Sequence, residues 1–172
     1  MKSRTELTLT HVEHTFQPIF DENSRILILG TFPSVKSRET DFYYGHPRNR
    51  FWRLLADITG NPQPDTIEDK KKMLLGSGIA VWDVVQSCDI HGSSDSSITN
   101  VVPADIKGLL AKTGISKIYA NGGTAESLYK KYCLGETGVD IVKLPSTSPA
   151  NAGYSYERLM EKWKVIADNL DR

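Results

Sequence analysis

The sequence predicts an α/β fold, a three-layer αβα arrangement in which helices cover both faces of a central four-stranded parallel sheet. Two observations lead to this prediction. Short apolar runs alternate along the chain with segments in which apolar residues have helical spacing. Such alternation, with helical crossovers between strands, is typical of parallel sheets buried on both faces. Because the 172 residues contain no linker, the whole chain, 1–172, is expected to form one domain.

The expected strands are short and mostly apolar, and polar residues follow each of them. Ile26–Leu29 is an unbroken apolar run, which indicates a strand buried on both faces. The full set of expected strands is 26–29, 78–82, 115–120 and 140–144. Since parallel strands point their carboxyl ends the same way, the segments leaving them should meet at one edge of the sheet, where ligands bind. Those segments are 30–49, 83–100, 121–124 and 145–151.

Helices are expected between these strands. Pro47 suits the first turn of a helix because its missing N–H costs nothing there. Thr66, with Asp69 three residues later, has the pattern of a capping box. The expected helices span 47–59, 66–76, 103–113, 124–132 and 155–170. Residues 1–13 are expected to be an irregular lead-in, and the polar, serine-rich segment 86–100 is expected to be a long loop.

Composition excludes several classes of protein. The formal net charge is zero, which argues weakly against a coat protein that binds nucleic acid without specificity. No apolar run approaches the roughly 20 residues that span a bilayer, and the first residues contain no signal-peptide core, so a cytoplasmic protein is expected. Cys88 and Cys133 lack metal-site spacing and are expected to be reduced thiols.

The segment after the first strand carries more chemistry than a connection needs. Five cations, Lys36, Arg38, Arg48, Arg50 and Arg53, lie near only two acidic residues, which is the charge pattern expected where phosphates approach. The alternative is an ordinary solvated helix face. His46 before a proline and Asn49 near a helix start likewise have a structural alternative, as a turn residue and a helix cap.

Other chemistries find no support. The chain has no GxxxxGK[ST] or GxGxxG motif, so the usual phosphate cradles of nucleotides and dinucleotides are missing. The four histidines form no HxxxH or HxH pair, so no metal site is expected. No GxSxG motif supports a serine hydrolase. No cofactor is expected.

Two motifs resemble those of a known family. The stretch GTFPSVKSRETDFYYGHPRNRFW, which begins at Gly30, resembles the first motif of the uracil-DNA glycosylase superfamily, and LPSTSPAN, which ends at Asn151, resembles the second. G[ST]FPS, YYxHPxNxFW, a WDV segment with a serine-rich loop, and LPSTSPAN together look most like its hypoxanthine-DNA (deoxyinosine) glycosylase branch, related to the G:T/U mismatch-specific enzymes. The resemblance covers about residues 14 to 170.

The resemblance implies roles for individual residues. Phe32 stands where the mismatch-specific enzymes place their catalytic Asn, so the catalytic role is carried over to Asn49, which would orient the attacking water or hydrogen-bond the departing base as negative charge builds on it. Tyr44 would stack on the flipped base, and Asp83 would accept a hydrogen bond from a ring N–H, which hypoxanthine has at N1 and adenine lacks. Phe32 and His46 would line the base site. The expected DNA contacts are Ser34, Arg48, Ser146, Thr147, Ser148 and Asn151, with the serines on phosphates and Asn151 filling the vacated stack.

The predicted function is therefore that of a monofunctional DNA glycosylase in base-excision repair. It would flip a deaminated base, most favourably hypoxanthine, out of the duplex and hydrolyse its glycosidic bond. The partner is DNA containing such a base, with no membrane involved and a monomeric protein. Two alternatives stay open: a mismatch-specific uracil or thymine glycosylase, and a non-catalytic binder of damaged DNA.

Overall fold

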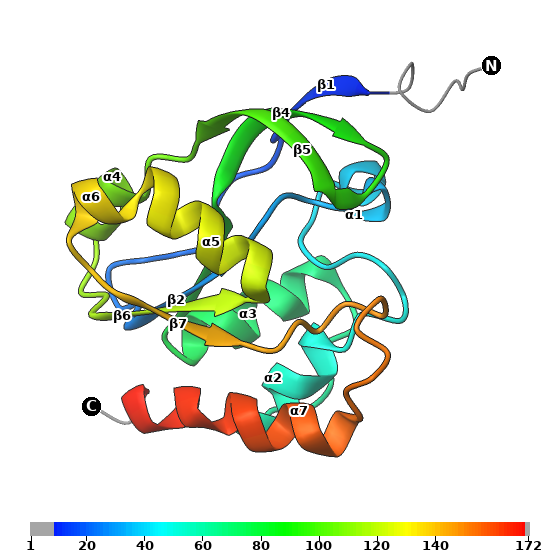
Figure 1. Cartoon of the computed structure of the whole chain (residues 1–172). Helices are drawn as coiled ribbons and strands as arrows, with labels where there is room; N and C mark the ends of the chain where they lie inside the picture. The colour runs from blue at the N-terminus through cyan, green and yellow to red at the C-terminus, as the bar shows by residue number, and fades with distance from the viewer. Residues whose placement is uncertain (1–8, 171–172) are drawn as a thin grey trace.

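The larger of two sheets has four parallel strands in the order β3-β2-β6-β7 (Figure 1). The structure, a computed structural model, describes residues 9–170. The four strands are β2 (Ile26–Gly30), β3 (Ile79–Asp83), β6 (Lys117–Asn121) and β7 (Ile141–Leu144). In the parallel register Ile26 lies opposite both Ile79 and Lys117. The predicted four-stranded parallel sheet is confirmed, with strand ends shifted by one or two residues.

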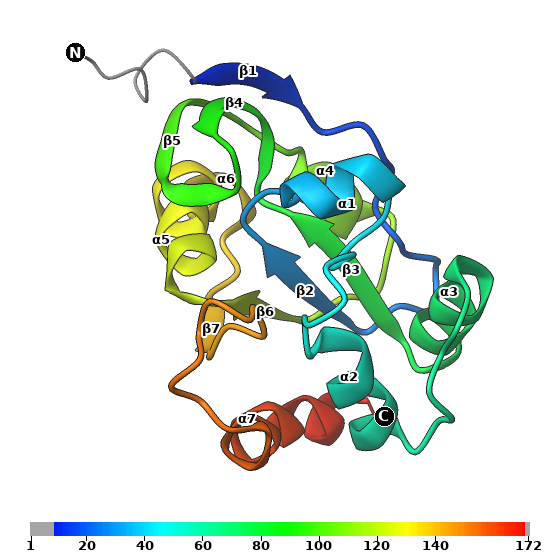
Figure 2. The ribbon, with the colours of Figure 1, turned by 90° about the vertical axis from the view of Figure 1, so that its right-hand side faces the viewer.

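Helices cover both faces of this sheet because successive side chains of β2 point in opposite directions. Ile26 and Ile28 pack against α2 (Phe51–Thr59), α3 (Ile67–Gly76) and α7 (Tyr156–Trp163). Leu27 and Leu29 pack in a second cluster with α4 (Ile106–Ala111) and α5 (Gly123–Tyr132). Figure 2 shows α2 and α7 on one side of the sheet and α5 on the other.

Helix ends agree with the sequence in part. The Thr66–Asp69 capping box is present at the start of α3. Two predicted helix starts are wrong. The helix predicted from residue 47 begins four residues later, at Phe51 (α2), and the helix predicted from residue 103 begins three residues later, at Ile106 (α4), after its cap, Asp105. The last helix ends at Trp163 and continues as a 3₁₀ helix over Lys164–Asn169. Two short helices, α1 (Val35–Thr40) and α6 (Leu134–Thr137), were not predicted.

A second, antiparallel sheet corrects two predictions. Its strands are β1 (Thr10–Glu13), β4 (Val85–His91) and β5 (Ser94–Pro103), in the order β1-β4-β5. The predicted loop 86–100 is therefore a hairpin, and the predicted irregular lead-in contains a strand; its residues 1–8 lie outside the described range. The sequence did not predict this hairpin because a serine, Ser87, is buried in β4 with Val85, Cys88 and Ile90. In β5 the serines face solvent, so neither strand has an apolar alternation.

Candidate active site

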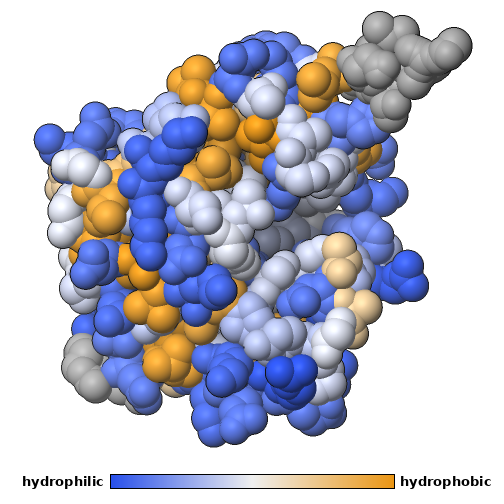
Figure 3. Space-filling model, viewed as in Figure 1, coloured by the Kyte–Doolittle hydropathy of each residue, from blue (hydrophilic) through white to orange (hydrophobic). Residues whose placement is uncertain are grey.

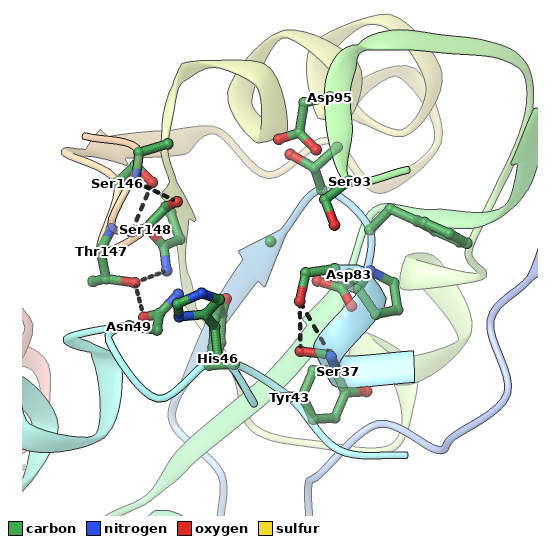
Figure 4. A pocket seen from close by; sticks show the side chains of 18 of the residues that line it. Ser37, Tyr43, His46, Asn49, Asp83, Ser93, Asp95, Ser146, Thr147 and Ser148 are labelled. Atoms are coloured by element: carbon green, nitrogen blue, oxygen red, sulfur yellow. Dashed lines mark hydrogen bonds between the residues drawn. The ribbon is translucent and has the colours of Figure 1, made fainter. Parts of the chain in front are cut away.

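A pocket of about 260 Å³ lies at the carboxyl edge of the larger sheet (Figure 4). Gly30, Asp83 and Asn121, the last residues of β2, β3 and β6, form part of its wall. The space-filling view shows a recess on the face seen in Figure 1, bordered mostly by hydrophilic and intermediate residues (Figure 3). Nine of the residues predicted from the sequence line the pocket: Phe32, Ser34, Tyr44, His46, Asn49, Asp83, Ser146, Thr147 and Ser148. Arg48 and Asn151 lie outside its lining.

Asn49 is held with its amide nitrogen free. It lies two residues before α2, not inside the helix as predicted, and its Oδ1 accepts hydrogen bonds from the Phe51 N–H at 3.0 Å and the Thr147 hydroxyl at 2.8 Å. Both donors identify the facing atom as oxygen. The Nδ2 group makes no hydrogen bond within the described residues, so Asn49 presents an N–H donor.

Thr147 and Asn121 support this orientation. The Asn121 Oδ1 accepts from the Thr147 N–H and its Nδ2 donates to the Thr147 hydroxyl, both at 3.0 Å. Thr147 is fully buried and joins Asn121 to Asn49, and its hydrogen bond to Asn49 is drawn in Figure 4; its contact with DNA stays a prediction. Asn121, whose role the sequence left open, is part of the site through this link.

Asp83 is buried at the floor of the pocket and paired with a histidine. Its Oδ2 lies 2.9 Å from His14 Nε2, and both side chains are almost completely inaccessible to solvent. A Cβ on Gly30 would lie 2.5 Å from Asp83 Oδ1 and 2.9 Å from the Tyr44 hydroxyl, so only glycine admits both groups there. The sequence contains no signal for His14, a lone histidine far from Asp83 in the chain.

The His14–Asp83 pair provides a first test. His14→Leu leaves a buried carboxylate without its donor and is expected to lower the free energy of unfolding by about 3 kcal/mol. His14→Gln keeps an N–H donor near the Nε2 position and should restore most of this stability. Urea unfolding measures both variants; equal destabilisation of the two would contradict a hydrogen-bonding role.

The sequence and the fold of this chain are similar to those of known proteins. The family model described as the uracil DNA glycosylase superfamily matches residues 17–169. This chain belongs to that superfamily. A hypoxanthine DNA glycosylase of Methanosarcina acetivorans is 35% identical over 90% of this chain and 98% of its own length. One of Methanosarcina barkeri is 40% identical over 48% of this chain and 53% of its own length.

A solved structure agrees. The solution NMR structure of an M. acetivorans protein, described as a candidate uracil DNA glycosylase, matches with a TM-score of 0.78 and 36% identity, covering 91% of this chain and 97% of that one. The predicted superfamily and its α/β fold are confirmed, and with them the prediction of a DNA glycosylase. Within residues 9–170, no helix is long and apolar enough to cross a bilayer, and no group of three or more His, Cys, Asp or Glu residues could hold a metal ion.

Tyr44 and Phe32 shape the apolar side of the glycosylase pocket. The Tyr44 ring stacks on Phe51 with centroids 3.9 Å apart, so one of its faces is already covered. Burial, followed by the charge of Asp83, raises the pKa of Tyr44, while the Asn121 side chain lowers it; the phenol therefore stays neutral. Phe32 is buried and meets His14 edge to face, at 6.1 Å between centroids.

The second superfamily motif forms a loop closed by its own hydrogen bonds. Ser146 Oγ accepts from the Ser148 N–H and Ser148 Oγ from the Ala150 N–H, and neither hydroxyl donates to another of residues 9–170, so both protons are available as donors. The Asn151 amide donates to the Ser146 carbonyl, so this side chain is engaged within the loop and does not project as a wedge. The exposed residue beside the pocket at this point is Ala150.

Most of the predicted basic patch serves the fold. Arg38 donates to the carbonyls of Pro33 and Gly92, Lys36 pairs with Glu39, and Arg53 lies over the Tyr156 ring. Arg50 donates to the carbonyls of Ser148, Asn151 and Tyr154 and so fastens the second motif to the first. Among these five side chains, Arg48 alone is exposed and makes no hydrogen bond, ion pair or ring contact within the described residues.

Alanine substitutions at Arg50 and Arg48 are expected to have different effects, one on stability and the other on DNA binding. Arg50→Ala removes a cation from three carbonyls and should destabilise the protein by roughly 3 kcal/mol in urea unfolding. Arg48→Ala should leave stability unchanged but weaken DNA binding of every sequence alike, with the salt dependence of log K reduced by about 1. A loss of stability in Arg48→Ala, or no loss in Arg50→Ala, would contradict the assignment of Arg50 to the fold and Arg48 to DNA binding.

The hairpin adds two pocket residues that were not predicted from the sequence, Ser93 and Asp95. Ser93 lies in the turn between β4 and β5 and Asp95 is the second residue of β5, both inside the segment expected to be a loop. Burial, and after it the charge of Asp83, raises the pKa of Asp95 to about 6, against the influence of the Thr31 side chain. The Asp95 residue nevertheless keeps an exposed surface, so water weakens the effect of the Asp83 charge on its pKa.

Proposed function

We propose that this protein is a DNA glycosylase that excises hypoxanthine from deoxyinosine in DNA. The observation that carries the proposal is the pairing, in one pocket, of a fixed acceptor with a fixed donor: Asp83 at the floor and the Asn49 amide at the side. Two hypoxanthine DNA glycosylases among the relatives support the choice of base.

Asp83 supplies the recognition of the base. Since His14 holds Oδ2, Oδ1 is the oxygen left for a substrate. A carboxylate accepts from the N1–H of hypoxanthine but meets a lone pair at N1 of adenine, so deamination turns a repulsive contact into a hydrogen bond. His46 and Phe32 line the same pocket, and Tyr44 has one ring face already taken by Phe51, so it would offer the base its other face.

Asn49 would act on the departing base. Both lone pairs of its Oδ1 are engaged by Phe51 and Thr147, so this oxygen cannot take a proton from an attacking water. The Nδ2 group can donate to the base as negative charge develops on it during cleavage, in a preorganised geometry that costs no rearrangement. Asn49 could position water or stabilise the leaving group, and stabilisation of the leaving group is the role that agrees with the two hydrogen bonds its Oδ1 accepts.

DNA contacts would come from the rim of the pocket. The Ser146 and Ser148 hydroxyls have free donors for phosphate oxygens, as does the Arg48 guanidinium, and Ser34 lies at the amino end of α1. Ala150, at the exposed tip of the second-motif loop, is better placed than Asn151 to occupy the vacated stack.

One observation favours a second substrate class. Uracil and thymine also carry a ring N–H, at N3, so Asp83 alone does not separate them from hypoxanthine. The non-catalytic alternative rests on Phe32 and predicts that the protein binds damaged DNA without cleaving it. Labelled duplexes containing inosine, uracil or a G·T mismatch, incubated with the protein and then treated with alkali, distinguish the three cases. The proposal predicts strand cleavage at inosine first; binding without cleavage would overturn it.

The proposed enzyme is a single-domain, cytoplasmic monomer that acts on DNA containing a deaminated base and uses water alone as co-substrate. Cys88 and Cys133 are both free and buried, which suits a reducing compartment. Gel filtration with light scattering tests the monomer, and cell fractionation tests the location.

A further inference from the structure

The tip of the β4–β5 hairpin is fastened at the mouth of the pocket. Arg38 of α1 donates to the Gly92 carbonyl at 3.0 Å and to the Pro33 carbonyl at 2.9 Å, tying the hairpin to the loop that follows β2. The Val35 N–H donates to Ser93 Oγ at 2.8 Å. These bonds hold the backbone beside Asp95 in place, so this carboxyl is a fixed part of the pocket wall (Figure 4).

The pocket therefore contains two carboxyl groups in different surroundings. Asp83 is buried and has a hydrogen-bond donor, His14. Asp95 lies at the open side, next to Thr31 and within the field of Asp83, and no cation pairs with it among the described residues. The other charged or titratable groups at this place are Arg38, which is engaged with carbonyls, His46 on the first-motif loop, Tyr43 and Tyr44 in the pocket lining, and Cys88 of β4. One carboxyl that accepts a hydrogen bond at the floor and a second carboxyl at the open side are the usual arrangement of an acceptor and an acid.

We propose that Asp95 is a general acid that protonates the purine as its glycosidic bond breaks. This role rests on the proposed function, because it assigns Asp95 to the flipped base in the same pocket. Asp83 would then hold the pyrimidine edge of the base through N1–H, and Asp95, on the hairpin, would reach a ring nitrogen elsewhere on the base.

The step balances without a further reactant. The C1′–N9 bond breaks and its electron pair passes to the purine, while the carboxyl proton of Asp95 moves to a ring nitrogen. Water forms a bond to C1′ and releases one proton to solvent, from which Asp95 is protonated again. The products are neutral hypoxanthine and an abasic site.

DNA binding should reinforce the protonated form. The pKa of Asp95, raised to about 6 in the free protein, should rise further when a base excludes water from the pocket and phosphates approach. Because the acid must carry its proton, the cleavage rate should be highest below the pKa of Asp95 in the complex and should fall as pH rises through it.

The test is the pH profile of single-turnover cleavage of an inosine duplex with enzyme in excess, from pH 5 to 9. Asp95→Asn is compared with the wild type and with Glu39→Gln, which removes an exposed carboxylate of α1 outside the pocket lining. Thermal melting at pH 6 and pH 8 confirms that each variant is folded, and reactions without enzyme correct for acid depurination.

Wild type and Glu39→Gln should both show a rate that falls at high pH. Asp95→Asn should be slower by about 10²-fold at pH 6, within the usual range for general acid catalysis, and its profile should be flat. A wild-type rate in Asp95→Asn, or a reduced rate that still falls with pH as in the wild type, would overturn the acid role while leaving the proposed function intact. A wild-type protein inactive on inosine at every pH would remove the proposed function and the acid role with it.

Discussion

Replacing Asn49 by alanine is expected to slow single-turnover cleavage of an inosine duplex by about 10²–10³-fold, the usual cost of one preorganised donor at developing negative charge. Affinity for the duplex should change little, because Asn49 does not face the phosphate-binding rim. The loss of the contacts to Phe51 and Thr147 should cost about 1–2 kcal/mol of stability, which leaves the protein folded.

Asn49→Asp separates the two roles of this side chain. A carboxylate still accepts from the Phe51 N–H and the Thr147 hydroxyl but has no proton to donate, so it should be as inactive as alanine. If Asn49 positioned the attacking water, a carboxylate would do so equally well or better. Asn23→Ala, at an exposed asparagine outside the pocket, is the matched control and should retain the wild-type rate. An Asn49→Asp variant with high activity would contradict leaving-group stabilisation.

Asp83→Asn is expected to slow inosine cleavage by about 10²-fold, as for a buried hydrogen bond to a charged group that is replaced by a mismatch. His14 donates to the atom at the Oδ2 position, so it should fix the new side chain with its oxygen toward His14 and its NH₂ toward the base. A donor would then face N1–H, and the preference for inosine over adenine should shrink.

The rates on inosine and adenine duplexes, measured under single turnover, test this reversal. His14→Gln serves as the matched control, since it preserves a donor to Asp83 and should keep the preference. Full activity and selectivity in Asp83→Asn would show that Asp83 does not recognise the base.

The fold was predictable where the local pattern and the tertiary environment agree. The apolar run Ile26–Leu29 is a buried strand because both of its faces are covered, and Thr66 with Asp69 caps α3 through contacts within four residues. The β4–β5 hairpin was missed because its buried face includes serine and its exposed face is serine and aspartate, so no alternation of apolar residues is visible.

The site was predictable only as far as its motifs extend. Asn49 and Asp83 were identified by their resemblance to superfamily positions, and the structure places both in one pocket. His14 bonds Asp83, 69 residues away, Asn121 bonds Thr147, 26 residues away, and Asp95 lies next to Thr31, 64 residues away; no spacing rule connects such residues. Arg38 and Arg50 were included in the basic patch because sequence charge does not reveal that backbone carbonyls already engage them.

The most direct test of the proposed activity is the identity of the base that the wild-type protein releases. Duplexes containing inosine or uracil, and an undamaged duplex, are incubated with excess protein, and the free bases are quantified by liquid chromatography with mass spectrometry. We predict one hypoxanthine for each abasic site from the inosine duplex, less uracil from the uracil duplex at the same time, and no adenine from the undamaged duplex. Tight binding of the inosine duplex with no release of hypoxanthine would contradict the proposed function.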